Sequence, residues 1–256
     1  MDNYTAFKNL HNQDSPLFLG NVWNTQSALL FQKLGFKAIG TSSAAIATSL
    51  GYEDGEKMPF KDLLRIVKNI QSKINIPLTV DIESGYNRNT TEIINNIIAL
   101  QKLGVVGINI EDSITVTERI IVNAQEFAKT IQSIKSHLSN NNIDIFLNVR
   151  TDYYIIGLTN PFEETLKRIK TYEESGADGI FVPCIVAENE IQKVVESTTL
   201  PVNVMCMPDL PNFNTLQDLG VKRISIGPFL YNGMVGKLEK SIIEIAKNQS
   251  FNSIFA

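Results

Sequence analysis

The chain has 256 residues, 43% of them hydrophobic, and a formal net charge of −4 at pH 7. Acidic and basic residues are interspersed, so no basic patch predicts a nucleic-acid partner. No apolar run approaches the roughly 18 residues of a transmembrane helix, and the N-terminal segment lacks the basic and apolar regions of a signal peptide. We therefore expect a cytoplasmic protein without a membrane partner. Cys184 and Cys206 are too few for a disulfide framework and are expected to be buried thiols.

Eight short apolar runs rich in Val, Ile and Phe alternate with segments of helical periodicity. The runs are mostly continuous rather than alternating with polar residues, which is typical of strands buried on both faces. The expected strands are residues 16–23, 37–42, 76–82, 105–112, 143–150, 178–183, 200–205 and 222–227.

Capping residues mark the helices between these strands. Asn89, Asn123 and Asn160 each precede a glutamate by three residues and a row of apolar residues at helical spacing. Gly104 and Gly176 suit the left-handed residue that ends a helix. Eight strands with intervening helices in about 250 residues predict an α/β fold, a single (β/α)₈ TIM barrel over residues 1–256. The alternative, a doubly wound open sheet, is disfavoured because no strand is followed by a G-x-G-x-x-G loop.

Active sites of TIM barrels lie where the strands end and the following loops begin. Polar or aromatic residues predicted at these ends are Asn21, Trp23, Thr41, Ser42, Asp81, Glu83, Glu111, Asp112, Asn148, Arg150 and Asn203. The runs "DIESG" (81–85) and "NIED" (109–112) place four acids after two neighbouring strands. Such carboxylates repel one another unless they are protonated or neutralised by a cation.

Oxygen ligands favour Mg²⁺, or Mn²⁺, over Zn²⁺. His11 and His137 lie in helical segments, so a zinc site with imidazole ligands and a Ser-His-Asp triad both lack a donor. The acids could instead cap turns, but four acids in adjacent loops exceed what turns require. Arg150 could likewise be a structural partner of the acids instead of binding a substrate anion. Trp23 either lines the pocket or belongs to the core.

Four stretches together resemble the isocitrate lyase/phosphoenolpyruvate mutase superfamily. They are residues 21–56, "PLTVDIESGY" (77–86), "GVVGINIEDS" (104–113) and "FLNVRTDYYI" (146–155), and the match runs in the right order over nearly the whole chain. The resemblance implies a TIM barrel, Mg²⁺ and a 2-oxo acid or phosphono acid whose C–C or C–P bond is made or broken. It also implies a homodimer or homotetramer, with the C-terminal helix at 229–247 packing on a neighbouring subunit.

The resemblance also implies roles for individual residues. Asp81 matches the acid that binds the metal directly, and Asp54, Glu83 and Glu111 match acids that hold it through water. Ser42, with the backbone amides of Ser43 and Ala44, matches the turn that receives a substrate oxygen, and Arg150 matches the grip on the anionic group. Among these, Ser42, Arg150 and Asp54 are the expected catalytic residues, and Trp23 and Asn203 complete the expected substrate site.

The chain departs from the family at the loop after Glu111, residues 113–122, which is the candidate lid. It has neither the Lys-Lys/Arg-Cys-Gly-His signature of the lyases nor the Lys-Thr-Asn-Ser run of the mutase, and Pro183 stands where a mutase-like member has histidine.

We expect a Mg²⁺-dependent lyase or decarboxylase that cleaves a C–C bond of an oxaloacetate-like 2-oxo acid through a metal-stabilised enolate. Decarboxylation makes the smallest further demand on the chain, because CO₂ leaves without a dedicated base. Retro-aldol cleavage would add a base, with Tyr52, Tyr86, Tyr153 or a metal-bound water as candidates. The alternatives are a phosphonopyruvate-type C–P mutase or hydrolase, and a metal- or metabolite-binding barrel with degraded catalysis.

Overall fold

The computed structural model describes residues 2–255. Eight parallel strands form a closed barrel in the order β1-β10-β9-β8-β7-β4-β3-β2, which confirms the predicted TIM barrel. The barrel strands are β1 (Leu17–Val22), β2 (Ile39–Thr41), β3 (Leu78–Asp81), β4 (Gly107–Glu111), β7 (Phe146–Arg150), β8 (Gly179–Val182), β9 (Val202–Met205) and β10 (Arg223–Ser225). All eight predicted strands are confirmed, and each is shorter than its apolar run because the residues at the ends of the run belong to the connecting loops.

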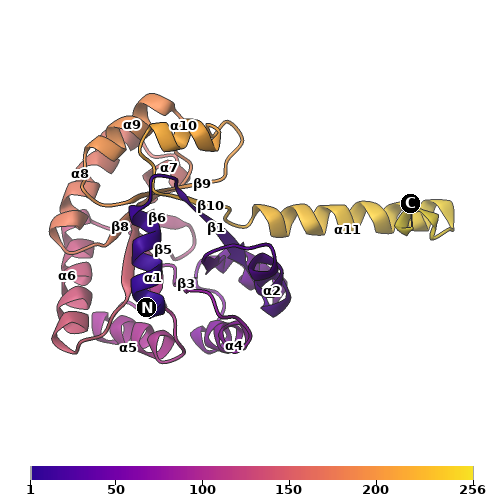
Figure 1. The fold of residues 1–256 in the computed structure, drawn as a ribbon, viewed down its shortest axis with the longest axis horizontal. Helices are drawn as coiled ribbons and strands as arrows, with labels where there is room; N and C mark the ends of the chain where they lie inside the picture. The colour runs from indigo at the N-terminus through magenta and orange to yellow at the C-terminus, as the bar shows by residue number, and fades with distance from the viewer. Residues whose placement is uncertain (1, 256) are drawn as a thin grey trace.

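Helices surround the barrel (Figure 1). They are α1 (Asn3–Asn9), η1 (Leu10–Asn12), α2 (Thr25–Lys33), α3 (Ser43–Ser49), α4 (Phe60–Gln71), α5 (Thr90–Gln101), α6 (Ala124–Asn140), α7 (Tyr153–Ile156), α8 (Pro161–Glu174), α9 (Glu188–Glu196), α10 (Phe213–Asp218), α11 (Phe229–Asn248) and η2 (Asn252–Ile254). The predicted caps Asn89 and Asn123 accept backbone N–H groups at the starts of α5 and α6. Asn160 precedes α8 in a left-handed conformation instead of the extended one typical of an N-cap, and its side chain makes no capping hydrogen bond. Pro161 takes the first helical position, as predicted.

The core lies between the outer face of the barrel and one face of each surrounding helix. Helix α4 shows the principle, since Leu63, Val67 and Ile70 recur at helical spacing and are fully buried. Burying each such side chain contributes about 1.5–3 kcal/mol relative to leaving it in water. The helices therefore hold the strands in register, and the strand ends become a rigid platform for the loops.

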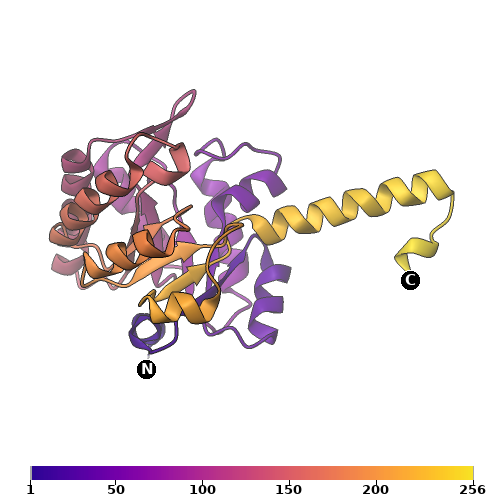
Figure 2. The ribbon, with the colours of Figure 1, turned by 90° about the horizontal axis from the view of Figure 1, so that it is seen from above.

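Helix α1 and the turn η1 cover the amino-terminal end of the barrel. Phe7 and His11 are buried there against Phe146, the first residue of β7, and the His11 and Phe146 rings stack with their centroids 4.5 Å apart. Figure 2 shows α1 at the end of the barrel opposite the hairpin loop that follows β4. The amino-terminal end is thus filled by side chains, and the site must be sought at the other end.

The loop after β4 is an antiparallel hairpin of β5 (Ser113–Thr115) and β6 (Arg119–Ile121). Residues 113–122 are the candidate lid, but the hairpin itself could not be predicted, because strands of three residues are too short to show a periodic pattern. Their mobility stays a prediction.

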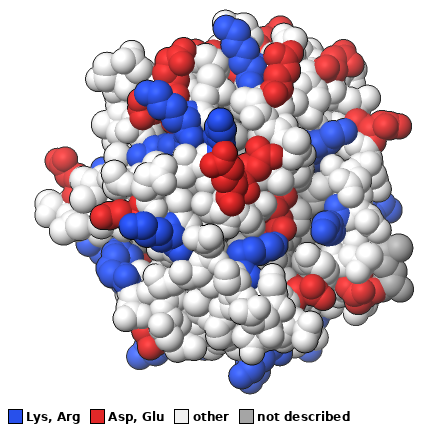
Figure 3. All heavy atoms as spheres, turned by 90° about the vertical axis from the view of Figure 1, so that its left-hand side faces the viewer, with Lys and Arg blue, Asp and Glu red and all other residues white. Residues whose placement is uncertain are grey.

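Helix α11 confirms the helix predicted at 229–247, and none of its residues is buried. It projects away from the barrel (Figures 1 and 2). No helix within residues 2–255 combines the length and apolarity that crossing a bilayer requires. On the face shown in Figure 3, acidic and basic side chains are intermixed.

The prediction that both cysteines are buried is wrong. Cys206 is exposed because it lies in the loop just after β9, and Cys184, in a left-handed conformation after β8, is half-buried with its Sγ 3.8 Å from Met207 Sδ.

Candidate active site

A cavity of about 130 Å³ opens at the carboxyl end of the barrel strands. Seven of the residues predicted from the sequence line it: Asn21, Ser42, Ser43, Ala44, Asp54, Asp81 and Arg150. They come from the ends of β1, β2, β3 and β7, from the start of α3 and from the loop before α4, so the barrel brings together residues that lie far apart in the chain. Ser42 caps α3, and its Oγ accepts the N–H of Ala45 at 3.3 Å.

Asp81 ends β3 and is held by its neighbours on both sides. Its backbone N–H donates to Thr41 Oγ1 at 2.9 Å, and its Oδ1 accepts the N–H of Glu83 at 3.0 Å. Glu83 has a φ of +50° and Gly85 a φ of +107°, so the run "DIESG" forms a tight turn in which glycine avoids strain. The turn directs the Asp81 carboxylate into the cavity, and burial raises the pKa of that carboxyl group.

Glu83 is buried behind Asp81. Its Oε2 accepts the N–H of Glu56 at 2.7 Å, and its Oε1 accepts the hydroxyl of Tyr86 at 3.2 Å. Burial, together with the negative charges of Asp54 and Asp81, raises the pKa of Glu83 to about 8. A carboxyl group with such a pKa is poised to ionise when a cation arrives.

This raised pKa predicts how stability depends on pH in the absence of Mg²⁺. Between the ordinary value of 4.5 and about 8, the folded protein binds a proton that the unfolded chain releases. The free energy of unfolding should therefore decrease as pH rises through this window, by about 5 kcal/mol at most from Glu83. Urea unfolding of the wild type between pH 5 and 8 should show a steeper loss than unfolding of Glu83→Gln. Equal slopes would contradict the assignment.

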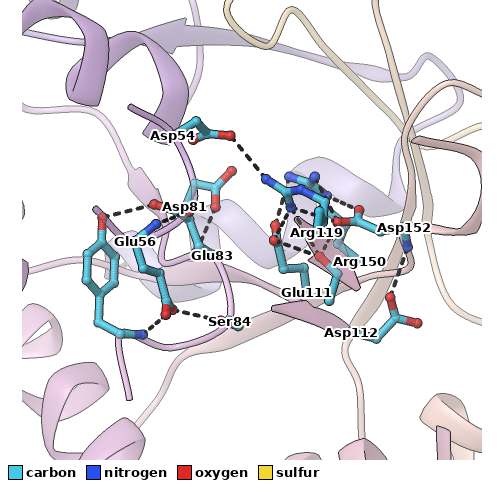
Figure 4. Close-up of polar contacts among 12 residues, drawn as sticks. Asp54, Glu56, Asp81, Glu83, Ser84, Glu111, Asp112, Arg119, Arg150 and Asp152 are labelled. Carbon is cyan, nitrogen blue, oxygen red and sulfur yellow. Dashed lines mark hydrogen bonds and ion pairs between the residues drawn. The ribbon is translucent and has the colours of Figure 1, made fainter. Parts of the chain in front are cut away.

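Glu111 ends β4 and is neutralised by two arginines. Its Oε2 lies 3.0 Å from Arg150 Nη1, and its Oε1 accepts hydrogen bonds from Arg119 and from Ser113 Oγ. Arg119, on β6, also contacts Asp152 Oδ2 at 2.9 Å and Asp54 Oδ2 at 3.1 Å. Figure 4 shows the carboxylates of Asp54, Glu111 and Asp152 around this one guanidinium group. The hairpin is thus tied to the rim of the cavity by charge.

Arg150 ends β7 and is fixed in place by Asp152. Its Nε donates to Asp152 Oδ1 at 2.5 Å and its Nη2 to Asp152 Oδ2 at 3.1 Å. Its guanidinium carbon lies 5.8 Å from the centre of the Phe181 ring. Burial alone would raise the pKa of Asp152, but the charge and hydrogen bonds of Arg150 hold it below its ordinary value.

Asp112 does not join the other strand-end acids, contrary to the expectation of four clustered carboxylates. The side chains of successive residues in a strand point to opposite faces. The side chain of Asp112 therefore points away from the cavity, on the opposite side from that of its neighbour Glu111. Its Oδ2 accepts Arg168 Nη1 at 2.8 Å and the Tyr172 hydroxyl at 2.7 Å, both from α8. Asp112 therefore anchors α8 to the barrel.

The remaining acids fit Mg²⁺ by their chemistry. No group of three or more His, Cys, Asp or Glu side chains within residues 2–255 is arranged as a metal site. Asp54, Asp81 and Glu83 nevertheless offer oxygen ligands only, and a bound cation would offset the burial that raises the pKa of Asp81 and Glu83. Arg119 already places one positive charge between Asp54 and Glu111. Metal ligation by Asp54, Asp81, Glu83 and Glu111 stays a prediction.

Trp23 and Asn203, which were expected in the substrate site, do not line this cavity. Trp23 lines a separate, apolar cavity beside α2 and the start of α11, and its ring packs edge-on against Tyr231. Trp23 comes two residues after Asn21, whose side chain points inward, so the alternation of a strand would place Trp23 inward as well. Strand β1 ends at Val22, however, and the chain turns outward at Trp23. Asn203 is buried inside the barrel, where its side chain bonds to neighbouring strands.

Sequence reasoning missed several residues of the site. Arg119 and Asn109 line the cavity, and Asp152 and Glu56 hold residues that line it or lie behind it. Asn109 could have been predicted, because it lies two residues before Glu111 on the same strand and its side chain therefore points to the same face. The sequence gives no indication of the position of Arg119, because that position depends on the hairpin.

Comparisons with known proteins point to one family. The family model for phosphoenolpyruvate phosphomutase matches residues 7–246. An uncharacterized protein of Mycobacterium tuberculosis is 32% identical over 227 residues, which are 89% of this chain and 83% of that protein. Oxaloacetate decarboxylase 1 of Pseudomonas fluorescens is 26% identical over 226 residues, 84% of this chain and 75% of that protein.

The fold has close counterparts among solved structures. A crystal structure from Burkholderia cenocepacia, described provisionally as a phosphonomutase, has a TM-score of 0.88 at 32% identity. The similarity covers 94% of this chain and 98% of that one, so the likeness extends well beyond the barrel strands.

Proposed function

Because the chain belongs to the phosphoenolpyruvate mutase/isocitrate lyase superfamily, we propose that it is a Mg²⁺-dependent lyase or decarboxylase that cleaves a C–C bond of a small, oxaloacetate-like 2-oxo acid. Relatives carry the names of C–C lyases, of decarboxylases and of a C–P mutase. The observation that supports the proposal most is the convergence of Asp81, Arg150 and the Ser42–Ala44 turn on one small cavity.

Mg²⁺ held by Asp81, with Asp54, Glu83 and Glu111 behind it, would supply Lewis-acid polarisation of a substrate oxygen. Arg150 is suited to hold the substrate's carboxylate. A guanidinium group has five N–H donors, and Asp152 accepts hydrogen bonds from two of them. Glu111 forms an ion pair with Nη1 but no hydrogen bond, so donors remain for bidentate binding of a carboxylate by a group that its partners have already oriented.

The start of α3 is suited to hold the oxygen on which negative charge develops. The backbone N–H groups of Ser43 and Ala44 belong to the first turn of the helix, where no intrahelical acceptor exists. Both residues line the cavity. Donors fixed by the fold before the reaction stabilise developing charge without reorganisation.

The three tyrosines that are candidate bases for a retro-aldol reaction lie away from the cavity. Tyr52 donates to Asp62 at 3.4 Å, Tyr86 donates to Glu83, and the Tyr153 ring stacks on Arg168. None of the three lines the cavity. This arrangement favours decarboxylation, in which CO₂ leaves without a base.

The proposal is tested by incubating the protein with Mg²⁺ and a panel of 2-oxo and phosphono acids and following the mixtures by NMR. We expect CO₂ or a second carbonyl product from a 2-oxo dicarboxylic acid, and no turnover by Asp81→Ala. Release or transfer of phosphate would show C–P chemistry instead. Binding of Mg²⁺ and oxalate without any turnover would support a barrel with degraded catalysis. A protein that neither binds Mg²⁺ nor responds to it with any 2-oxo acid would refute the proposal.

We also propose that α11 packs on a neighbouring subunit in a homodimer or homotetramer. Leu230, Met234, Leu238 and Ile242 recur every four residues and form an exposed apolar stripe along the helix. The stripe begins at the apolar cavity beside α2, where Leu30 and Leu34 are also exposed. An apolar stripe of this length normally lies against another protein surface.

The assembly can be tested by replacing Leu238 and Ile242 together with aspartate. Analytical ultracentrifugation should show an oligomer for the wild type and a 28.5 kDa monomer for the double variant. The circular dichroism of the barrel should remain, because α11 contributes no buried residue to it. Reversing the charges of Glu239 and Lys240 on the same helix is the matched control and should leave the oligomer intact. A monomeric wild type would contradict the proposal.

A further inference from the structure

Asn109 lies at the floor of the cavity, and neither the family resemblance nor the proposed chemistry gives it a role. It is 6% exposed, lines the cavity and sits on β4 directly beside Asp81 of β3 in the sheet register. On its other side it faces Asn148 of β7. Its neighbours determine which end of its amide group faces the cavity.

The first constraint comes from Asn203. Its Nδ2 lies 2.6 Å from the carbonyl oxygen of Val204 and 3.3 Å from that of Arg223. Carbonyl oxygens only accept hydrogen bonds, so this atom must be the nitrogen. Asn203 Oδ1 then accepts from Asn148 Nδ2 at 3.2 Å, and the same nitrogen donates to Asn109 Oδ1 at 2.9 Å. The orientation of the Asn203 amide therefore determines that of Asn148, which in turn determines that of Asn109.

The second constraint is independent and comes from Arg223. This guanidinium group is buried inside the barrel, and its Nη2 donates to Asn109 Oδ1 at 3.2 Å. Burial lowers the pKa of Arg223 to about 9, so near pH 7 the group is still protonated and can only donate. A flipped Asn109 would turn its NH₂ group toward two donors. Both constraints thus place Oδ1 inward and Nδ2 toward the cavity.

Within residues 2–255, Asn109 Nδ2 has no hydrogen-bond partner, in contrast to Oδ1, which has two. We propose that Asn109 is a substrate-binding residue whose Nδ2 donates to an oxygen of the 2-oxo acid beside Asp81. Asn148, Asn203 and Arg223 are positioning residues that fix this donor. The inference rests on the proposed function and deepens it. A hydrogen-bond donor next to the carboxylate proposed to bind the metal would favour planar acids that carry oxygen atoms on two adjacent carbons.

Oxalate, which carries two adjacent carboxylates, is the probe for the test. Isothermal titration with Mg²⁺ present should show oxalate binding about 10- to 100-fold weaker to Asn109→Ala than to the wild type, because a hydrogen bond to a charged group is lost. Asn109→Asp should bind still more weakly, since it places a carboxylate where the donor was. Mg²⁺ affinity without oxalate should stay within about twofold of the wild type in Asn109→Ala, which separates a substrate contact from damage to the acid cluster.

Thr79→Val is the matched control. Thr79 lies two residues before Asp81 on the neighbouring strand, is equally buried, and its hydroxyl has no partner among residues 2–255. Because it does not line the cavity, its replacement should leave oxalate affinity unchanged.

A second measurement uses the wild-type protein and so does not depend on whether a variant folds. The side-chain NH₂ resonances of Asn109, assigned by their absence from Asn109→Ser, should shift when Mg²⁺ and oxalate are added together. Unmoved resonances, an unchanged oxalate affinity in Asn109→Ala, or an equal loss of Mg²⁺ affinity there would each overturn the role of Asn109 while leaving the proposed function standing. Failure of the wild type to bind oxalate with Mg²⁺ would overturn both.

Discussion

Asp81→Ala is expected to abolish Mg²⁺ binding and to lower the turnover of any 2-oxo acid substrate by at least about 1000-fold. Asp81 is the carboxylate that the "DIESG" turn directs into the cavity, and its Oδ1 is already oriented by the N–H of Glu83. Without it, the other acids at the rim are either paired with arginine or lie behind the cavity. Calorimetric titration with Mg²⁺ and steady-state kinetics measure the two effects separately.

Asp178→Asn is the control for this prediction. Asp178 precedes β8 at the opposite end of the barrel, where it pairs with Lys135 and accepts the N–H of Leu147. Its replacement should affect stability alone and leave Mg²⁺ affinity and turnover unchanged. Mg²⁺ binding by Asp81→Ala with wild-type affinity would show that the metal, if bound, is held elsewhere.

Arg150→Gln is expected to lower the free energy of unfolding by about 3–5 kcal/mol, besides removing the grip on the substrate. Asp152 is fully buried and Glu111 nearly so, and Arg150 is the more buried of the two arginines that pair with both of them. Removing one member of such a network leaves the others charged and buried, which costs far more than the pair contributes. Urea denaturation at pH 7 measures the loss.

A double-mutant cycle separates this explanation from simple loss of packing. If uncompensated charge is the cause, Arg150→Gln combined with Asp152→Asn should be more stable than the sum of the two single losses predicts. Strict additivity of the two losses would argue that Arg150 acts only by filling space over Phe181. Arg65→Gln is a suitable control, because the Arg65 side chain is 63% exposed and little stability depends on its ion pair with Asp62.

The barrel could be predicted from the sequence because strands buried on both faces leave continuous apolar runs. Asp81 was identified as a site residue by the same logic, since it ends such a run and precedes a turn. Asp112 shows the limit of this logic. Asp112 and Glu111 are adjacent in the sequence, and only the alternation of side chains along β4 places them on different faces. The arginine and tyrosine that bind Asp112 lie on a helix more than fifty residues later in the chain.

Arg119 could not be assigned because its neighbours are distant in the chain. It contacts Asp54, which lies 65 residues earlier, and Asp152, which lies 33 residues later. Its placement depends on a hairpin whose strands have three residues each. Asn203 was expected at the strand end as a ligand contact, but its amide satisfies carbonyl groups inside the barrel. Whether a polar residue near the end of a strand faces the cavity or bonds to other strands inside the barrel can be decided only when the register of the neighbouring strands is known.

The aromatic side chains packed at the amino-terminal end of the barrel have a consequence for how ligands reach the cavity. Phe7, His11 and Phe146 pack against one another at that end, whereas Arg119 lines the cavity at the carboxyl end of the strands. If the proposed cleavage takes place, the substrate would enter and both products would leave on the side of Arg119 and the hairpin.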